Sequence, residues 1–527
     1  MPAPAIDRAF GRRIAALVNR GGGALLPGGL RGVEKESLRV DTVGHIATTP
    51  HPRALGSALT NAQFTTDYSE ALLELVTPTF TTNWELLQYL CDMHQFVFRH
   101  LGEELLWATS MPCRIKSDAS IPIAQYGRSH IGRMKTVYRE GLGLRYGRVM
   151  QAISGVHFNY SFPERFWEAY ATLPEAHRSG DVMRSAAYFD LLRNFRRHGW
   201  LVLYLFGASP AVCQSFLRVR GETLPPLTQG TAFEPYATSL RMSDLGYRNR
   251  KQAGVTVSVN SLDDYVRDLT RAISTPYPPY EALGVRDGDE WRQLNANLLQ
   301  IENEYYSNIR PKRVARSGER PTKALLRGGV EYVEVRALDV SAFDPVGVNQ
   351  VKLRFLEAFL ALCLLRESPP IGGDEQEALD RNHVIVARRG REPGLTLQRD
   401  GRSVPMAAWA GELLDDMAGL CEILDAGSAA RPYTAALEAQ RAKLRDVERT
   451  PSARLLQEIR STGASFFELA YGMSAAHKSY FLELHAPNPG RLEEFRQGAE
   501  ASLDRQQAIE AADTGSFAEY LERYFAN

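Results

Sequence analysis

Acidic residues stand inside apolar, β-prone stretches of this chain, where an unpaired charge would be unfavourable to bury. Residues 32–40 predict a strand with Glu34 and Glu36 on one face, about 6–7 Å apart along it. Two carboxylates at that spacing repel each other, so the pKa of one rises unless a cation lies between them. The segment therefore indicates either a magnesium site with oxygen ligands or the solvated face of an edge strand, with Lys35 on the opposite side.

A second acidic stretch covers residues 65–78. As a strand it would place Glu74 on an otherwise apolar face, which is an unfavourable position for an unpaired carboxylate. Asp67 has the opposite parity, so both side chains can face one site only if the chain turns or bulges between them. As a short helix it would instead turn Glu70 and Glu74 towards water. The pattern leaves helix and strand equally open.

Two further stretches, 151–162 and 329–339, alternate as strands do. Their polar faces carry His157, Asn159 and Ser161 in the first, and Tyr332, Glu334 and Arg336 in the second. A lone strand histidine is more often a surface residue than a ligand, and Glu334 and Arg336 can simply neutralise each other. Beside the paired acids, however, the polar faces indicate groups able to bind metal and phosphate.

Together these strands predict a mostly antiparallel sheet that lines a cleft with carboxylates, a histidine and an arginine. Such a cleft suits magnesium nucleotide chemistry, in which cations neutralise the charge of a transferring phosphoryl group. The sequence has no Walker-type phosphate loop and no G-x-G-x-x-G after a strand, so basic side chains would have to hold a nucleotide. A proline-broken basic loop at 309–319 and a short run at 132–135 offer candidates, although either can be merely solvated: Arg310, Lys312, Arg313 and Arg133.

The composition indicates an ordinary enzyme rather than a nucleic-acid or membrane protein. The 62 basic and 62 acidic residues balance, which removes the electrostatic case for binding nucleic acid or an anionic membrane. The five cysteines are scattered and lack C-x-x-C spacing, which predicts reduced thiols in a cytoplasm and no zinc site. No targeting signal stands out, since the apolar run at 14–18 is too short for one.

The pattern changes along the chain and predicts an α+β fold. Residues 30–350 mix alternating strands with helices such as 84–99 and 186–204, whereas helical periodicity dominates afterwards, in 351–365, 406–424, 433–448 and 491–512. We expect a short N-terminal amphipathic helix before a break at 21–23, and a loop at 369–373. We therefore predict a catalytic region, 1–350, and a mainly helical region, 351–527, packed together as one catalytic unit.

Several longer motifs resemble the glutamate–cysteine ligases of proteobacteria. They span about the first two thirds of the chain, with a weaker similarity at 393–397. The motifs are residues 32–40, Thr48-Thr49-Pro50-His51-Pro52, 54–60, Thr65-Thr66-Asp67-Tyr68, Ser110-Met111-Pro112-Cys113, 153–157, 204–210, 236–247, 299–306 and 331–339. The resemblance implies a glutamine-synthetase-like fold. It also implies ATP-dependent joining of the γ-carboxylate of L-glutamate to the amine of L-cysteine through a γ-glutamyl phosphate, the first step of glutathione synthesis.

The resemblance also implies roles for individual residues. Magnesium, or manganese in its place, would be held by Glu34, Glu36, Asp67, Glu74, His157 and Glu334. Arg336 would steady the phosphoryl group during transfer. The positions that would bind the amino-acid substrates, chiefly around cysteine, are Tyr68, Tyr138, Leu142, Gln151, Ile153, Arg241, Tyr247 and Tyr306.

One residue departs from the family pattern: Tyr68 stands where we expect Phe, which adds a hydroxyl to the implied thiol pocket and leaves the selection of the amine open. Two other functions remain to be separated, namely another carboxylate–amine ligase of the same superfamily and a non-catalytic nucleotide- or metal-binding module. From the family we expect a monomer in the cytoplasm. We expect no added glycine-ligating activity, because no second ATP-binding region follows residue 527.

Overall fold

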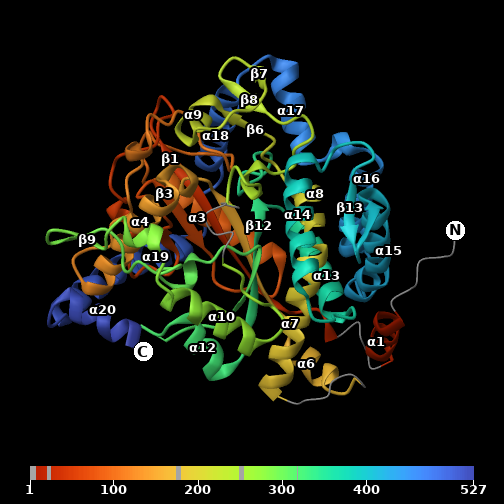
Figure 1. The fold of residues 1–527 in the computed structure, drawn as a ribbon. Coiled ribbons are helices and arrows are strands. Elements are labelled where there is room, and N and C mark those ends of the chain that lie inside the picture. The colour runs from red at the N-terminus through yellow and green to blue at the C-terminus, as the bar shows by residue number, and fades with distance from the viewer. Residues whose placement is uncertain (1–7, 20–24, 174–179, 248–254, 317, 527) are drawn as a thin grey trace.

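A seven-stranded antiparallel sheet lies at the centre of the computed structural model, which describes residues 8–19, 25–173, 180–247, 255–316 and 318–526 (Figure 1). The strand order is β11-β12-β5-β1-β3-β2, and β4 pairs with β1 beside this path. The strands are β1 (Leu30–Val40), β2 (Phe64–Thr66), β3 (Leu72–Val76), β4 (Leu105–Leu106), β5 (Gly155–Ser161), β11 (Ile309–Lys312) and β12 (Tyr332–Asp339).

The sheet confirms the strands predicted around Glu34, His157 and Glu334. The stretch around Glu74, left open between helix and strand, forms strand β3. One expectation was wrong: the basic segment that begins at residue 309 starts with strand β11 rather than a loop. The strand tolerates Pro311 because β11 lies at the edge of the sheet, where a missing N–H donor disrupts only one ladder.

The strand register places the acidic residues side by side on one face. Glu34 pairs with His157, and Glu36 pairs with Glu74. Glu334, on β12, pairs with Asn159, on β5. Because successive side chains of a strand alternate between faces, the residues between these positions form the opposite, apolar face of the sheet.

Helices pack against that apolar face and build the main hydrophobic core. They are α3 (Asn83–Phe98), α7 (Gly180–His198), α8 (Trp200–Phe206) and α13 (Gln350–Leu365). α13 is apolar almost all round and buried along nearly its whole length, which is typical of a helix enclosed by other elements. The predicted helix 186–204 is in fact two helices, because Gly199, a poor helix former, separates α7 from α8.

The remaining helices surround the sheet; α15 and α16 lie beside α13 along one flank, and α14 packs against α8 (Figure 1). They are α1 (Arg8–Val18), α4 (His130–Tyr146), α5 (Arg148–Gln151), α6 (Glu164–Tyr170), α9 (Gln214–Arg220), α10 (Leu262–Ser274), α11 (Pro278–Glu281), α12 (Pro321–Gly328), α14 (Gly373–Arg389), α15 (Met406–Leu424), α16 (Pro432–Arg445), α17 (Pro451–Thr462), α18 (Phe466–Glu483), α19 (Pro489–Ala512) and α20 (Phe517–Ala526).

The helices confirm the expected change of pattern after residue 350, with one short strand pair, β13 and β14, in the described part of the chain beyond it. The small sheets comprise β6 (Ala211–Cys213), β7 (Pro226–Thr228) and β8 (Thr231–Phe233); β9 (Arg286–Asp287) and β10 (Glu290–Trp291); β13 (Thr396–Arg399) and β14 (Arg402–Pro405). The loop expected at 369–373 joins α13 to α14, while the break expected at 21–23 lies outside the described residues except for the ends that flank it.

The cysteines differ from the expectation of reduced thiols. Cys113 and Cys213 form a disulfide, with their Cα atoms 5.3 Å apart. Spacing along the sequence cannot reveal such a pair, because the fold brings together residues separated by 100 positions. Cys91, Cys363 and Cys421 are free thiols.

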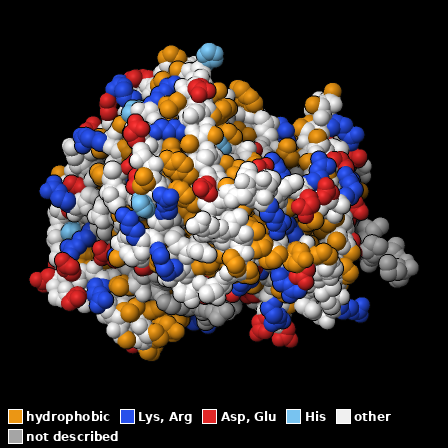
Figure 2. Space-filling model, turned by 90° about the horizontal axis from the view of Figure 1, so that it is seen from above, with side chains coloured by type: hydrophobic (Ala, Val, Ile, Leu, Met, Phe, Trp, Pro, Cys, Tyr) orange, Lys and Arg blue, Asp and Glu red, His pale blue; other side chains and the backbone are white. Residues whose placement is uncertain are grey.

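The exterior matches the balanced composition. Acidic and basic side chains are interspersed over the face shown in Figure 2, with apolar side chains between them. Among the described residues, no helix combines the length and apolar character needed to cross a bilayer.

Candidate functional site

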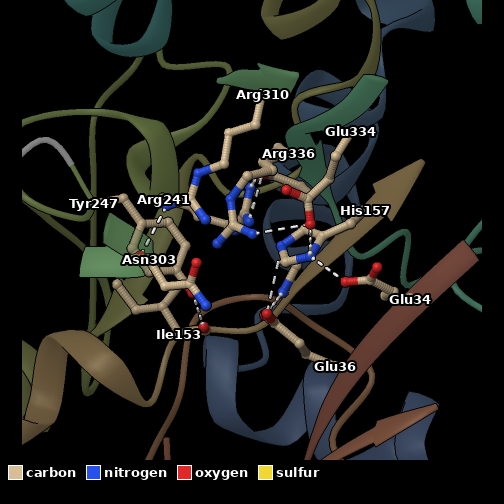
Figure 3. Close-up of polar contacts among 12 residues, drawn as sticks. Glu34, Glu36, Ile153, His157, Arg241, Tyr247, Asn303, Arg310, Glu334 and Arg336 are labelled. Atoms are coloured by element: carbon tan, nitrogen blue, oxygen red, sulfur yellow. Dashed lines mark hydrogen bonds and ion pairs between the residues drawn. The ribbon is translucent and has the colours of Figure 1, made fainter. Parts of the chain in front are cut away.

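Three carboxylates meet on the polar face of the sheet, around the imidazole of His157 (Figure 3). Its Nδ1 atom lies 3.1 Å from Glu34 Oε2 and 3.7 Å from Glu334 Oε1. Its Nε2 atom lies 3.5 Å from Glu36 Oε1. Three neighbouring strands supply these groups, so the sheet register fixes the spacing of the cluster rather than a flexible loop.

The carboxylates of the cluster have displaced pKa values. Burial, followed by the charges of Glu34, Asp67 and Glu36, raises the pKa of Glu74 well above its ordinary value. Burial raises the pKa of Glu36 as well, and the charge of Asp67 adds to the effect. Like charges held together in a buried place account for both shifts. Asp67 therefore belongs to the same cluster, at the end of β2.

Two other carboxylates of the cluster have lowered pKa values. Burial raises the pKa of Glu334, but the charges of Lys312, Arg336 and His157 outweigh burial and lower it. Burial and the charge of Glu334 raise the pKa of Glu34, but the hydrogen bond and charge of His157 prevail and lower it. Half of the cluster is thus balanced by cations, whereas the half around Glu74 is not.

The donor set fits a divalent cation. One ligand atom each of Glu34, Glu74 and His157 lies within 4.8 Å of the others, the spacing that a single bound ion needs. The excess of negative charge around Glu74 supplies a second reason for a cation to bind there, because it would relieve the repulsion that raises this pKa. Asn159 Nδ2 donates to Glu34 Oε1 at 2.8 Å and orients that carboxylate.

Basic side chains border the acidic cluster on the side of β11 and β12. Arg336 Nη1 donates to Glu334 Oε1 at 3.2 Å, and Lys312 Nζ lies 3.5 Å from Glu334 Oε2. Arg310 pairs with Glu334 in the register and donates to the carbonyl oxygens of Asn303 and Tyr305. Glu334 is therefore the residue at which the acidic cluster meets these basic side chains.

Arg241 joins the site from the short 3₁₀ helix η3 (Leu240–Met242) (Figure 3). Its Nη1 and Nη2 atoms both donate to the main-chain carbonyl of Arg336, each at 3.2 Å. The guanidinium lies over the ring of Tyr247, 4.7 Å from its centroid. Tyr247 in turn packs against Tyr306, with ring centroids 5.0 Å apart, and its hydroxyl donates to the carbonyl of Ile153.

A cavity of about 610 Å³ opens beside these residues. Arg241, Tyr247, Tyr306 and Arg336 line one side of it, and residues of α14 line the other. A cavity of this size, with aromatic walls and a few convergent charges, is typical of a small-molecule site.

The other substrate positions of the sequence analysis form an adjoining apolar wall. Tyr68, Leu142 and Ile153 are buried in one hydrophobic cluster, against which Tyr138 packs. Gln151 is also buried, and its Nε2 atom has no hydrogen-bond partner among the described residues. A buried amide donor without a partner indicates a place where a ligand or water would complete the hydrogen bond.

Two candidate nucleotide residues lie away from the cluster. The guanidinium of Arg133, on α4, lies over the ring of Phe517, 4.6 Å from its centroid. Arg313 donates to the carbonyls of Gly328 and Gly329 and so caps the end of α12. Of the four basic candidates, the structure places Arg310 and Lys312 beside Glu334 and these two elsewhere.

Two further polar residues, to which the sequence assigned no individual role, belong to the surroundings of the site. Asn159 stands two residues after His157 on the same face, so strand parity alone could have included it. Counted along the sequence from Val333 and Val335, Asp339 falls on the apolar face of β12, but the register shift after Val335 pairs it with Gly155, and it is fully buried. A carboxylate at a core-facing position signals bonded partners, and this signal was available in the sequence.

Comparisons with known proteins identify the family of this chain. Residues 14–386 match the family model described as glutamate-cysteine ligase. The glutamate–cysteine ligase of Alcanivorax borkumensis is 49% identical over 523 residues, covering 98% of this chain and 99% of the relative. That of Pseudomonas aeruginosa is 49% identical over 518 residues, covering 98% of each.

Solved structures give the same result. The glutamate–cysteine ligase of Francisella tularensis, solved in complex with AMP, superposes with a TM-score of 0.89 at 36% identity, covering 95% of this chain and 98% of that chain. The bifunctional glutathione synthetase of Pasteurella multocida shares the fold, with a TM-score of 0.72 at 24% identity over 89% of this chain and 55% of that chain. The resemblance seen in the sequence motifs is confirmed, and the chain belongs to the glutamate–cysteine ligase family.

Proposed function

We propose that this protein joins the γ-carboxylate of L-glutamate to the amine of L-cysteine with the hydrolysis of ATP to ADP and phosphate. The observation that carries the proposal is that Arg241 and Arg336 line one cavity while Arg336 also donates to Glu334 of the acidic cluster, in a chain of this family. The anionic phosphates of ATP need cations near them, and the carboxylate of an amino acid needs a guanidinium.

Magnesium is the metal that the donor set fits, since carboxylates are its usual ligands. The residues that would hold it are Glu34, Glu36, Asp67, Glu74, His157 and Glu334. When bound, the metal would supply positive charge against the phosphates of ATP. Manganese, which also accepts oxygen and imidazole ligands, would be an effective replacement.

The chemistry proceeds in two transfers. A γ-carboxylate oxygen of glutamate attacks the terminal phosphorus of ATP, the bond from that phosphorus to ADP breaks, and an acyl phosphate forms. The cysteine amine then attacks the acyl carbon, the amide bond forms, and phosphate leaves as the amine loses a proton. Arg336 faces the acidic cluster with a guanidinium whose planar fork suits phosphoryl oxygens, so we assign it to the charge that develops in the first transfer.

The amino acids would bind along the aromatic wall of the cavity. The guanidinium of Arg241 is the group suited to a substrate carboxylate, and its buried Nε atom has no hydrogen-bond partner among the described residues. Tyr138, Leu142, Ile153, Tyr247 and Tyr306 would exclude water from the acyl phosphate, which hydrolysis would otherwise consume.

Tyr68 introduces a polar atom into this wall. Its hydroxyl is buried, has no hydrogen-bond partner among the described residues, and lies against Gly143 on α4, where a Cβ atom would come within 2.6 Å of it. Gln151, whose Nε2 atom is also without a partner, is the second polar group available to the incoming amine substrate. We therefore assign selection of the amine to these two residues and their apolar neighbours.

For the nucleotide, we propose Lys312 and Arg310 as contacts, because both lie next to Glu334 of the acidic cluster. The AMP bound by the Francisella relative supports a nucleotide site in this fold. Arg133 and Arg313, which were candidates from sequence, interact with other parts of the chain. The glutamine-synthetase-like fold, the two regions 1–350 and 351–527, the monomeric state and the cytoplasmic location stay predictions.

An isotope experiment tests this proposal. With glutamate labelled with ¹⁸O in its γ-carboxylate, the released phosphate should carry one ¹⁸O atom per turnover and the product mass should be that of γ-glutamylcysteine. Unlabelled phosphate would contradict the acyl phosphate, and nucleotide binding without turnover would favour the non-catalytic module. Glu331→Gln is a suitable control variant, because Glu331 is exposed directly before β12, the strand that carries Glu334.

A further inference from the structure

Asp339 is a fully buried carboxylate bonded to Ser239, directly before Arg241's helix η3, and to Ala208 and Ser209, in the stretch after α8 that pairs with Ser239. Its Oδ2 atom accepts hydrogen bonds from the N–H of Ala208 and the hydroxyl of Ser209, both at 2.7 Å. Its Oδ1 atom accepts from the hydroxyl of Ser239 at 2.8 Å. A buried carboxylate requires hydrogen-bond donors, so Asp339 fixes the positions of the segments that supply them.

The two serines connect Asp339 to η3 through hydrogen bonds. Ser209 accepts from the N–H of Arg241 through its hydroxyl, at 3.2 Å, and from the N–H of Leu240 through its carbonyl, at 2.8 Å. Ser239 is the N-cap of η3, and its hydroxyl accepts from the N–H of Met242 at 3.3 Å. Each serine thus donates to Asp339 and accepts from a main-chain N–H of η3.

The same contacts also connect η3 to β12, the strand that carries Arg336. The pairing of β12 with β5 shifts between Val335 and Leu338, so Arg336 lies within a bulge, and Asp339 follows it directly. Bulges of this kind re-aim side chains beside active sites. Arg241 donates to the carbonyl of Arg336, and its Nη1 atom lies 3.9 Å from Asp339 Oδ1. The carboxylate therefore holds η3 and the bulged strand in one arrangement.

We propose that Asp339 is a positioning residue that holds the guanidinium of Arg241 in the substrate cavity against the main chain of Arg336. This inference rests on the proposed role of Arg241 in binding an amino-acid carboxylate. Asp339 touches no substrate itself, and it acts by orienting η3.

An asparagine would keep the size of the side chain and disturb the bonding. Its amide has a single acceptor atom, whereas Asp339 serves three donors, so the Asn NH₂ group would face an N–H or hydroxyl donor. The helix η3 would shift away, and Arg241 would move with it. Asp339→Asn should raise the KM of one amino-acid substrate about tenfold or more and leave the KM of ATP within about twofold.

A matched control distinguishes positioning from stability. Glu357 is likewise buried and bonded, to Arg31 at 3.1 Å, to Asn83 at 2.6 Å and to Tyr433 at 2.9 Å, and none of these partners lines the cavity. Glu357→Gln should lower the unfolding temperature without changing any KM. A merely structural Asp339 would behave in the same way.

The decisive experiment compares Asp339→Asn, Arg241→Ala and the double variant by the KM of each substrate. If Asp339 acts through Arg241, the double variant should match Arg241→Ala within about twofold. A further rise of the same KM in the double variant, or an unchanged KM in Asp339→Asn, would overturn the inference. An unchanged KM in Arg241→Ala would instead overturn the proposed substrate role of Arg241.

A second variant covers the case in which Asp339→Asn does not fold. Ser239→Ala removes one donor to Asp339 and the N-cap of η3 while leaving the carboxylate in place. It should raise the same amino-acid KM by about threefold, in line with the loss of one cap. An unchanged KM in this variant would count against the positioning role.

Discussion

Gly155 leaves open the space that the guanidinium of Arg241 occupies, since a Cβ atom on residue 155 would overlap Arg241 Nη2. The N–H of Gly155 also donates to Glu36 Oε2 at 2.6 Å. A single glycine at the start of β5 therefore borders both the acidic cluster and the arginine proposed to bind substrate. The need for glycine here arises from this close approach and not from an unusual backbone angle.

The substitution Gly155→Ala tests this relationship. The new methyl group should displace Arg241 and lower kcat/KM by about 10- to 100-fold, because small misplacements of a binding group are expensive. Steady-state kinetics with each amino acid checks this. Gly419→Ala is the control: Gly419 is exposed in α15 with open space around it, so activity should not change and the helix should gain about 0.5–1 kcal/mol. Normal kinetics in Gly155→Ala would contradict the assigned place of Arg241.

Glu74→Gln should have opposite effects on stability with and without metal. The carboxylate lies among Glu34, Asp67 and Glu36, so its loss should relieve repulsion and raise the unfolding temperature in the presence of a chelator. Magnesium should then stabilise the variant less than the parent protein, because one ligand is missing. Thermal unfolding with chelator and with magnesium measures both. Equal stabilisation by magnesium in the two proteins would remove Glu74 from the metal site.

Arg336→Lys should impair the chemical step more than nucleotide binding. A lysine keeps the positive charge beside Glu334 but lacks the planar fork for phosphoryl oxygens. We expect kcat to fall about 100-fold or more while the KM of ATP stays within about threefold. Arg313→Lys should leave both unchanged, since Arg313 caps α12. A change confined to the KM of ATP would show that Arg336 binds nucleotide without serving the transfer.

His198 should contribute to acid sensitivity far from the site. Burial, and then the charges of Arg366, Arg197 and Arg399, lower its pKa well below the ordinary value of 6.5. The native state therefore stays unprotonated as the pH falls below 6.5 while the unfolded state binds a proton. Stability is lost across that window, by up to about 1.4 kcal/mol per pH unit.

His198→Gln should therefore flatten the fall in denaturation midpoint between about pH 6.5 and pH 4.5. Denaturant titrations across this range measure the slope for the parent and variant proteins. His485→Gln, at an exposed position, should keep the slope of the parent. An unchanged slope in His198→Gln would mean that His198 gains its proton in the native state.

Strand alternation predicted the acidic face of the sheet, because Glu34, Glu36, His157 and Glu334 occupy same-face positions whose partners are set by register. It could not decide between helix and strand at Glu74, since a short apolar run fits both periods. Pairing with β1 resolved that choice. The roles of these residues came from the motif resemblance. The family comparison confirms that resemblance, and the roles of the individual residues stay predictions.

The errors have tertiary causes. The edge position of β11 permits a strand that contains Pro311, and no local signal marks an edge. The disulfide between Cys113 and Cys213 depends on the folded chain bringing distant segments together. The sequence cannot distinguish an arginine that binds a ligand from one that caps a helix. The structure shows that the partners of Arg313 are main-chain carbonyls.

The most direct test of the central claim is phosphate release from ATP with magnesium and L-glutamate, measured without amine, with L-cysteine, with L-2-aminobutyrate and with a panel of other amines. We predict that release is fastest with L-cysteine and that the product has the mass of γ-glutamylcysteine. Faster release with another amine would contradict the assignment of the substrate, and no amine-dependent release at all would contradict ligase activity.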